Sequence, residues 1–152
     1  ACQSRSMSKT SRSEAAKKAW ETRRRTARRE VIDRSTADGR ILLHAQRAAA
    51  GAIGRASKAG LPVDVDWMRR APAQIQAQDY CCALTGIRFD VDYRTKGAGG
   101  THLAPSPDRV DPRAGYVEGN VRWVLWAVNR AKGEMPDELF LRICKAVVDG
   151  HS

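Results

Sequence analysis

The chain has no long apolar run and few cysteines, and both absences limit what it can be. No stretch approaches the ~18 apolar residues that cross a bilayer, and no segment has the charged, apolar and small regions of a signal peptide. We therefore expect a soluble intracellular protein. The four cysteines (Cys2, Cys81, Cys82, Cys144) have no C-x-x-C spacing, which argues against a disulfide framework and a four-cysteine zinc site. We expect Cys81 or Cys82 to be an ordinary buried thiol.

Acidic residues are scarce near the N-terminal end. Residues 1–40 contain 12 Lys/Arg and 5 Asp/Glu, a net charge of +7, whereas residues 41–152 contain 15 and 12, a net charge of +3. A basic segment beside a nearly neutral body is typical of proteins that bind a polyanion, most simply nucleic acid. The alternative is a solvated basic tail. Met7 is a candidate natural start, which would make residues 1–6 an expression-vector remnant.

A chain of 152 residues has room for one compact domain and an arm. Residues 1–35 are predicted to form the basic arm, as a helix with too few apolar residues to be buried. It would expose an arginine cluster that binds phosphate in a salt-dependent way, namely Arg23, Arg24, Arg25, Arg28 and Arg29. Residues 36–80 are predicted to be helical. One helix should run from Thr36 to Lys58, and a shorter one within residues 64–78 should break near Pro72.

Residues 81–135 change in character and are predicted to form a small α+β core. A turn at Thr85-Gly86 should lead into an alternating strand over residues 87–91, and residues 96–100 form a glycine-rich loop. A second strand is expected over residues 107–112, with Val110 turned inward. A tight connection would lead to a return strand over residues 121–124 and a helix over residues 125–132 that ends at Gly133.

Residues 136–152 are predicted to form a C-terminal helix that packs on the core. Its apolar residues recur at helical spacing, at Leu139, Phe140, Ile143 and Val147. The predicted fold class is therefore α+β and mostly helical, with a β-hairpin and helix at its centre, further helices around them and the basic arm.

The hairpin and its helix would bring polar side chains together. Asp108 on the first strand and Asn129 on the helix would reach one cation from opposite sides, and such oxygen ligands with waters and a phosphate oxygen suit Mg²⁺. Simpler interpretations also exist. Asp108 and Arg109 could form a surface ion pair, Asn120 could be a turn residue, and Asn129 could be solvated.

This segment resembles the HNH endonucleases. Their motif has Asp-His-Ile with a nearby proline, then an Asn before an apolar strand, then Cys-x-x-Cys-Asn-x-x-Lys on a helix. Asp108-Arg109-Val110 with Pro112 matches the first element, Asn120-Val121 the second, and residues 129–132 the third, nine residues after Asn120. The resemblance covers about 50 residues, from Cys82 to Gly133, and their wording looks like a phage-associated branch of the family. It implies a ββα-metal fold, one Mg²⁺ or Mn²⁺ held by Asp108 and Asn129, and the cytoplasm of a bacterial or phage-infected cell.

The family's zinc cysteines are largely missing. Their positions fall on Cys82, Thr85, Leu125 and Val128. A structural zinc needs about four nitrogen or sulfur ligands, so no structural zinc is expected, and hydrophobic packing should fill the same space.

The family's catalytic histidine is replaced by Arg109. Arginine stays protonated and cannot accept a proton from water, but it would bind phosphate or stabilise developing negative charge. Water would then be activated by His102, Asp111 or solvent. Asn120 would fix the hairpin. Further phosphate contacts are expected from two residues on the helix, Arg130 and Lys132.

Two functions follow from this resemblance. The leading hypothesis is a metal-dependent endonuclease that acts on double-stranded DNA. The rival is a nucleic-acid-binding protein that keeps the fold without the chemistry, and the arginine at position 109 favours it. An RNA-directed protein is a third hypothesis. A homodimer is also considered, and no membrane partner is expected.

Overall fold

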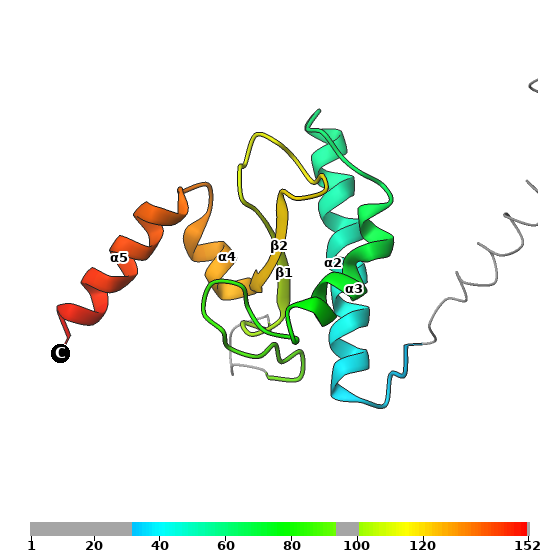
Figure 1. Ribbon diagram of the computed structural model, residues 1–152, viewed down its shortest axis with the longest axis horizontal. Coiled ribbons are helices and arrows are strands. Elements are labelled where there is room, and N and C mark those ends of the chain that lie inside the picture. The colour runs from blue at the N-terminus through cyan, green and yellow to red at the C-terminus, as the bar shows by residue number, and fades with distance from the viewer. Residues whose placement is uncertain (1–31, 94–100, 152) are drawn as a thin grey trace, which may run out of the picture. The chain divides into compact units, whose positions relative to one another are not determined.

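The computed structural model describes residues 32–93 and 101–151, so the predicted basic arm with its arginine cluster and the loop at 96–100 lie outside the described residues. The described part contains four helices and one antiparallel hairpin (Figure 1). In chain order these are α2 (Ala37–Lys58), α3 (Trp67–Ala77), β1 (Pro105–Arg109), β2 (Val121–Leu125), α4 (Trp126–Lys132) and α5 (Asp137–Asp149). The predicted class, α+β and mostly helical, is confirmed. None of the helices in these residues has the length and apolar content needed to span a membrane.

Helix α2 begins at Ala37, one residue after the predicted start at Thr36, and ends at Lys58 as predicted. The hydroxyl of Thr36 caps it by accepting a hydrogen bond from the amide of Gly39, at 3.0 Å, which satisfies one of the free donors of the first turn. Its buried side is made mainly of small residues, and alanines let the helix lie close to the hairpin.

Helix α3 continues through Pro72, so the predicted break is wrong. Proline lacks the amide that would bond the carbonyl of Met68 four residues earlier. Met68 lies on the exposed side of the helix, where water can take the place of that donor. The buried side of α3 consists of Trp67, Ala71 and Ile75.

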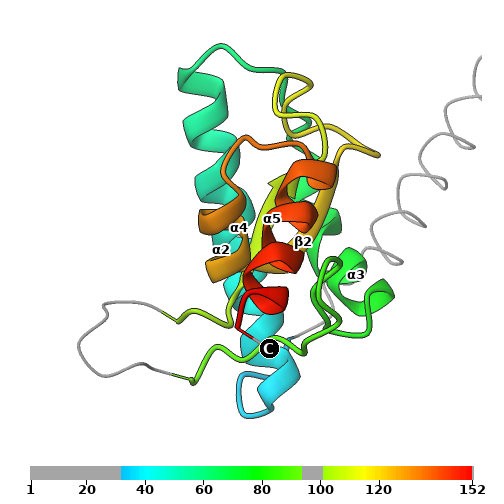
Figure 2. The same cartoon turned by 90° about the vertical axis from the view of Figure 1, so that its left-hand side faces the viewer.

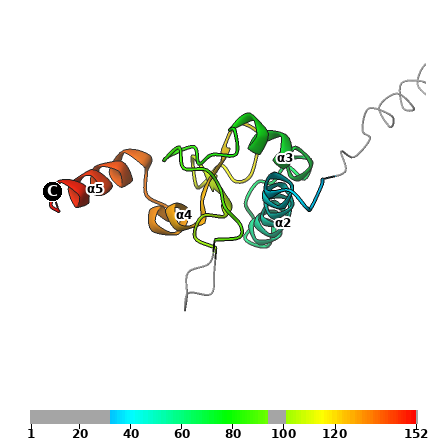
Figure 3. The same ribbon diagram turned by 90° about the horizontal axis from the view of Figure 1, so that it is seen from below.

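The hairpin lies between helices, with α2 and α3 on one side and α4 on the other (Figures 1 and 3). Asp108 is paired with Arg122 across the strands, and Arg109 with Val121. The first strand is Pro105–Arg109 rather than 107–112, and Val110 is 51% exposed instead of turned inward. Because side chains alternate along a strand, Asp108 faces α4 whereas Arg109 faces the side of α2 and α3.

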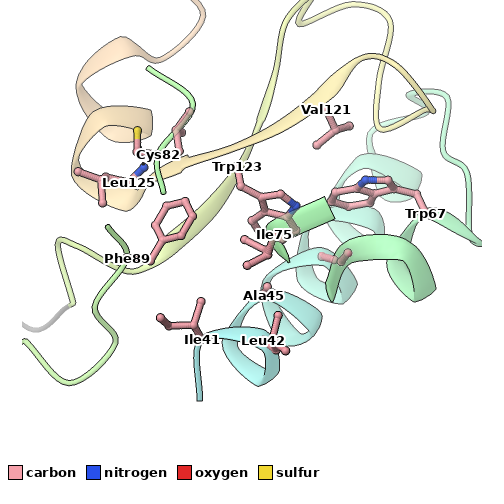
Figure 4. Packing of buried hydrophobic residues seen from close by; sticks show 13 residues of the cluster. Ile41, Leu42, Ala45, Trp67, Ile75, Cys82, Phe89, Val121, Trp123 and Leu125 are labelled. Carbon is pink, nitrogen blue, oxygen red and sulfur yellow. Dashed lines mark hydrogen bonds between the residues drawn. The ribbon is translucent and has the colours of Figure 1, made fainter. Parts of the chain in front are cut away.

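Stacked aromatic rings form the centre of the core (Figure 4). The rings of Trp67 on α3 and Trp123 on β2 lie 5.7 Å apart with an angle of 18° between their planes. Both indole N–H groups donate to the side-chain oxygen of Gln74, each at 3.1 Å. The two largest apolar side chains are thus buried without leaving a polar atom unsatisfied.

Residues 81–93 do not form the predicted strand. Phe89 is buried, but Ile87 is half exposed, and the pairing is a single bridge between Cys81 and Arg88. The turn at Thr85-Gly86 is present, with Gly86 at a φ of 70°. Cys82 is buried, as expected for one of the two adjacent thiols, and its sulfur accepts a hydrogen bond from the amide of Leu125 at 3.4 Å.

Most apolar residues of helix α5, which lies in front in Figure 2, are exposed. Phe140 is its one buried residue, whereas Ile143 and Val147 are 43% and 57% exposed. The prediction that this helix packs on the core is therefore wrong beyond its first turn. The amphipathic pattern is real, but no other described helix or strand lies along the second half of α5.

Candidate functional site

Asp108 and Asn129 lie on the same side of the hairpin, as the expected cation pair requires. The side-chain amide of Asn129 donates to the hydroxyl of Ser106 at 2.8 Å and to the carbonyl oxygen of Pro107 at 3.1 Å. These bonds tie α4 to β1, so Asn129, which is partly buried, has a structural role here.

The carboxylate of Asp108 is enclosed by two cations. It is 3% exposed, and its Oδ2 accepts hydrogen bonds from Nε and Nη2 of Arg122 at 2.9 and 2.8 Å. Its Oδ1 lies 3.3 Å from Nζ of Lys132, which is 1% exposed. A lysine this deeply buried cannot contact a phosphate in solvent. The expectation that Lys132 binds phosphate is therefore corrected: its charge neutralises Asp108 instead.

Asp137 from α5 completes this arrangement. Both of its oxygens accept hydrogen bonds from Arg122, each at 2.6 Å, and Lys132 lies 3.6 Å away. The bonds from Arg122 hold the pKa of Asp137 below its usual range, and the same bonds raise the pKa of Arg122. We call these residues the four-charge cluster: Asp108, Arg122, Lys132 and Asp137. Two positive and two negative charges make it electrically balanced.

The four-charge cluster does not fit the divalent cation that the resemblance implies. The charge of Asp108 is already balanced by Arg122 and Lys132, and repulsion between fixed positive charges and a divalent ion is strong where water is excluded. Residues 32–93 and 101–151 also contain no group of three or more His, Cys, Asp or Glu side chains that could hold a metal.

Arg109 lies on the other side of the hairpin from Asp108 and is held there. Its guanidinium carbon is 5.3 Å from the centre of the Tyr116 ring, and its Nη1 donates to the carbonyl of Pro112 at 2.7 Å. Tyr116 in turn stacks on Trp67, with ring centres 5.7 Å apart. Arg109 therefore ends a continuous stack that starts at Trp123, and it does not converge with Asp108 on one phosphate.

Asn120 fixes the loop of the hairpin. Its side-chain oxygen accepts from the amide of Asp111 at 2.9 Å, and its side-chain nitrogen donates to the carbonyls of Asp111 and Gly115 at 2.9 and 2.7 Å. The carboxylate of Asp111 is exposed and accepts from the amide of Arg113 at 2.9 Å. Asp111 thus shapes the turn, and its side chain is directed to that turn rather than to the four-charge cluster.

His102 lies at the opposite end of α4 from the four-charge cluster. Its ring is 5.4 Å from that of Trp126, the first residue of α4, whereas Asp108 contacts Lys132, the last. Six residues of helix span roughly 9 Å. The structure therefore does not bring together the residues proposed to activate water and the carboxylate proposed to hold the metal.

The aliphatic residues expected in place of a zinc site do pack together. Cys82 and Leu125 are both buried in the same hydrophobic cluster, and Val128 packs against it. Thr85, at the remaining position, is exposed on the turn.

A basic groove lies where the end of α2 meets the hairpin loop. It has a volume of about 440 Å³, and its polar rim consists of Arg55, Arg109, Arg113 and Glu134. Three positive charges face one negative charge there. Arg130 is elsewhere, exposed and placed over the ring of Trp126 at 5.3 Å, and its contact with phosphate stays a prediction.

Five charged residues of these two regions were not expected from the sequence, one of them Glu134 on the groove. Arg122 and Asp137 belong to the four-charge cluster, and Arg55 and Arg113 to the basic groove. The hairpin register would have revealed Arg122, because it places opposite charges directly across the two strands. Nothing in the local sequence points to the groove, since its residues come from separate elements.

Comparisons of the chain with protein-family models, with curated proteins and with solved structures find no match.

Proposed function

We propose that this protein binds double-stranded DNA and has the hairpin–helix layout of the HNH-like endonucleases without their metal-dependent hydrolysis. One observation carries the proposal: both oxygens of Asp108 are engaged by Arg122 and Lys132 inside the protein. The residue that would hold a metal is thus used to hold α4 and α5 to the hairpin.

The charge of the chain supports DNA as the partner. The net charge is +10, and the excess is greatest in residues 1–40. Within the described part the basic groove adds a second concentration of arginine. Neutralising phosphates with such side chains releases counterions, which favours binding most at low salt.

The proposal is tested by measuring binding and cleavage on the same preparation. Fluorescence anisotropy with a labelled DNA duplex should show binding that weakens by orders of magnitude between ~50 and ~200 mM salt. Supercoiled plasmid incubated with the protein and Mg²⁺ or Mn²⁺ should stay supercoiled, as it does with a chelator.

Two results would overturn the proposal. One is the absence of DNA binding at low salt. The other is nicking of plasmid that requires the divalent metal and disappears in an Asn129→Ala protein, since that pattern would identify a working endonuclease site.

A further inference from the structure

Helix α2 lacks acidic residues along most of its length. From Gly39 to Lys58 the sequence contains no Asp or Glu. Three basic residues of this stretch are exposed, Arg47, Arg55 and Lys58. Their spacings of eight and eleven residues place them within about a quarter turn of one another, because each residue advances a helix by about 100°. They form one basic stripe.

A glycine lies within the stripe. Gly51 falls between Arg47 and Arg55 on the same side of α2, and a Cβ atom there would lie 3.2 Å from Nη1 of Arg55. The guanidinium of Arg55 therefore extends back over Gly51 toward Arg47. Gly51 adds no side chain of its own between the two arginines.

The stripe ends in the basic groove. Arg55 belongs to both, and Arg109 and Arg113 enter the groove from the hairpin. Several arginines elsewhere pair with carboxylates, as Arg40 does with Asp92. Within the described residues, the three groove arginines form no ion pair with Asp or Glu.

Helix polarity alone does not account for this concentration of charge. Arg55 and Lys58 occupy the last turn of α2, where cations complement the partial negative charge of a helix end. Arg109 and Arg113 come from a different element and are not required by the helix. Gathering three arginines around one carboxylate costs free energy, unless a further anion occupies the groove.

We infer that the stripe and the groove together bind the phosphate backbone of duplex DNA, with Arg55 and Arg113 each neutralising one phosphate at the groove. This inference rests on the proposed function and identifies the surface that binds the DNA. The stripe from Arg47 to Lys58 is about 16 Å long, which equals roughly five base-pair steps of ~3.4 Å. Glu134 is the one carboxylate on the groove and opposes binding.

The test compares two full-length variants that lose the same charge. The groove variant carries Arg55→Gln and Arg113→Gln, and the control carries Arg69→Gln and Arg142→Gln, which are exposed residues of α3 and α5. Loss of two phosphate contacts should weaken duplex binding roughly tenfold or more near ~0.15 M salt. It should also reduce the slope of log K against log[salt] by about 1.8. The control should keep the wild-type slope.

Two further variants make the test specific. Lys58→Gln, on the stripe alone, should lower the slope by about 0.9. Glu134→Gln should tighten binding, because it removes the negative charge from the groove. Each variant is also measured in a protein whose arm is neutralised (Arg23, Arg24, Arg25, Arg28 and Arg29 to Gln), so that the arm does not mask the groove.

The outcomes separate this inference from the function on which it rests. If the wild type does not bind duplex DNA, the proposed function fails. If the wild type binds and the groove variant binds with the same affinity and slope, the groove is not the site, although DNA binding stands. Equal competition by duplex RNA would overturn the assignment to DNA. Melting curves confirm that each variant is folded.

Discussion

Asp108 and Arg109 are adjacent in the chain, but their side chains have opposite surroundings. Asp108 is buried between two cations, whereas Arg109 lies on an aromatic ring at the edge of a groove. A buried charge that is paired on both sides adds little net stability, because desolvation offsets the attraction. Removing one partner alone is costly. The four-charge cluster therefore fixes the geometry of α4 more than it adds to the free energy of folding.

Replacing Asp108 should destabilise the protein strongly. In Asp108→Ala the ammonium group of Lys132 stays buried without its nearer partner, and we expect the free energy of unfolding to fall by about 3–5 kcal/mol. Urea unfolding followed by circular dichroism measures this change.

A second substitution distinguishes a structural from a metal-binding carboxylate. Adding Lys132→Met to Asp108→Asn removes both charges and leaves Arg122 paired with Asp137. We expect this double variant to be more stable than Asp108→Ala. If Asp108→Ala were as stable as the wild type, the carboxylate would not stabilise the fold, and a functional role would be the better explanation.

Among the elements, α5 depends on few contacts. Phe140 is buried, and Asp137 binds Arg122, but the rest of the helix is mostly exposed. How firmly α5 is held to the hairpin should therefore depend on whether the carboxylate of Asp137 is ionised.

The stability that Asp137 provides should depend on pH in acid. Its folded pKa is lowered by Arg122, so its contribution is complete above the unfolded value, about 3.9, and is lost as the pH falls through the folded value. The difference in unfolding free energy between wild type and Asp137→Asn should stay constant from about pH 7 to 5 and shrink below about pH 4. Asp149→Asn, which breaks an exposed pair with Lys145, is the control and should show little difference at any pH.

The hairpin loop depends on a glycine that no other residue can replace easily. Gly115 has a φ of 76°, and a Cβ atom there would lie 2.0 Å from the carbonyl oxygen of Pro62. That oxygen accepts a hydrogen bond from Tyr116 at 3.0 Å, so the backbones have to stay close.

Gly115→Ala should lower the free energy of unfolding by more than the unfavourable backbone conformation alone would. Gly119 has a similar φ of 78° but open space around it, so Gly119→Ala should cost about 1–2 kcal/mol. Gly115→Ala adds a backbone clash and should exceed that value clearly in thermal or urea unfolding. Equal costs for the two substitutions would show that the contact with Pro62 is unimportant.

At the scale of the whole molecule, local sequence predicts local structure well. The helix through Lys58 and the hairpin followed directly by a helix are both present, and Thr36 caps the helix. Each of these depends on residues close together in sequence, where capping chemistry and turn residues decide the outcome. Asp108 and Asn129 also lie on the same side of the hairpin, as their positions on the strand and the helix indicate.

What the sequence did not predict depends on distant contacts. The pattern of α5 indicates which side is apolar, but not whether another element covers it. Nothing in the sequence around Lys132 distinguishes it from an exposed lysine on a helix. Its burial follows from the position of Asp137 and from the strand register, which depend on distant contacts. Arg109 stands at the position where the HNH motif has a histidine. Its contact with Tyr116, a residue outside that motif, determines where its side chain lies.

The stacking of Trp67 on Trp123 has an optical consequence. These indoles come from α3 and β2, 56 positions apart in the chain, and are nearly parallel at 5.7 Å. Transition dipoles at such a separation couple, so we expect a circular dichroism contribution that disappears when either tryptophan is replaced. Because Tyr116 and Arg109 continue the same stack to the rim of the groove, that contribution reports whether the hairpin is seated on α3. The intact chain thus contains its own chromophore for following events at the groove.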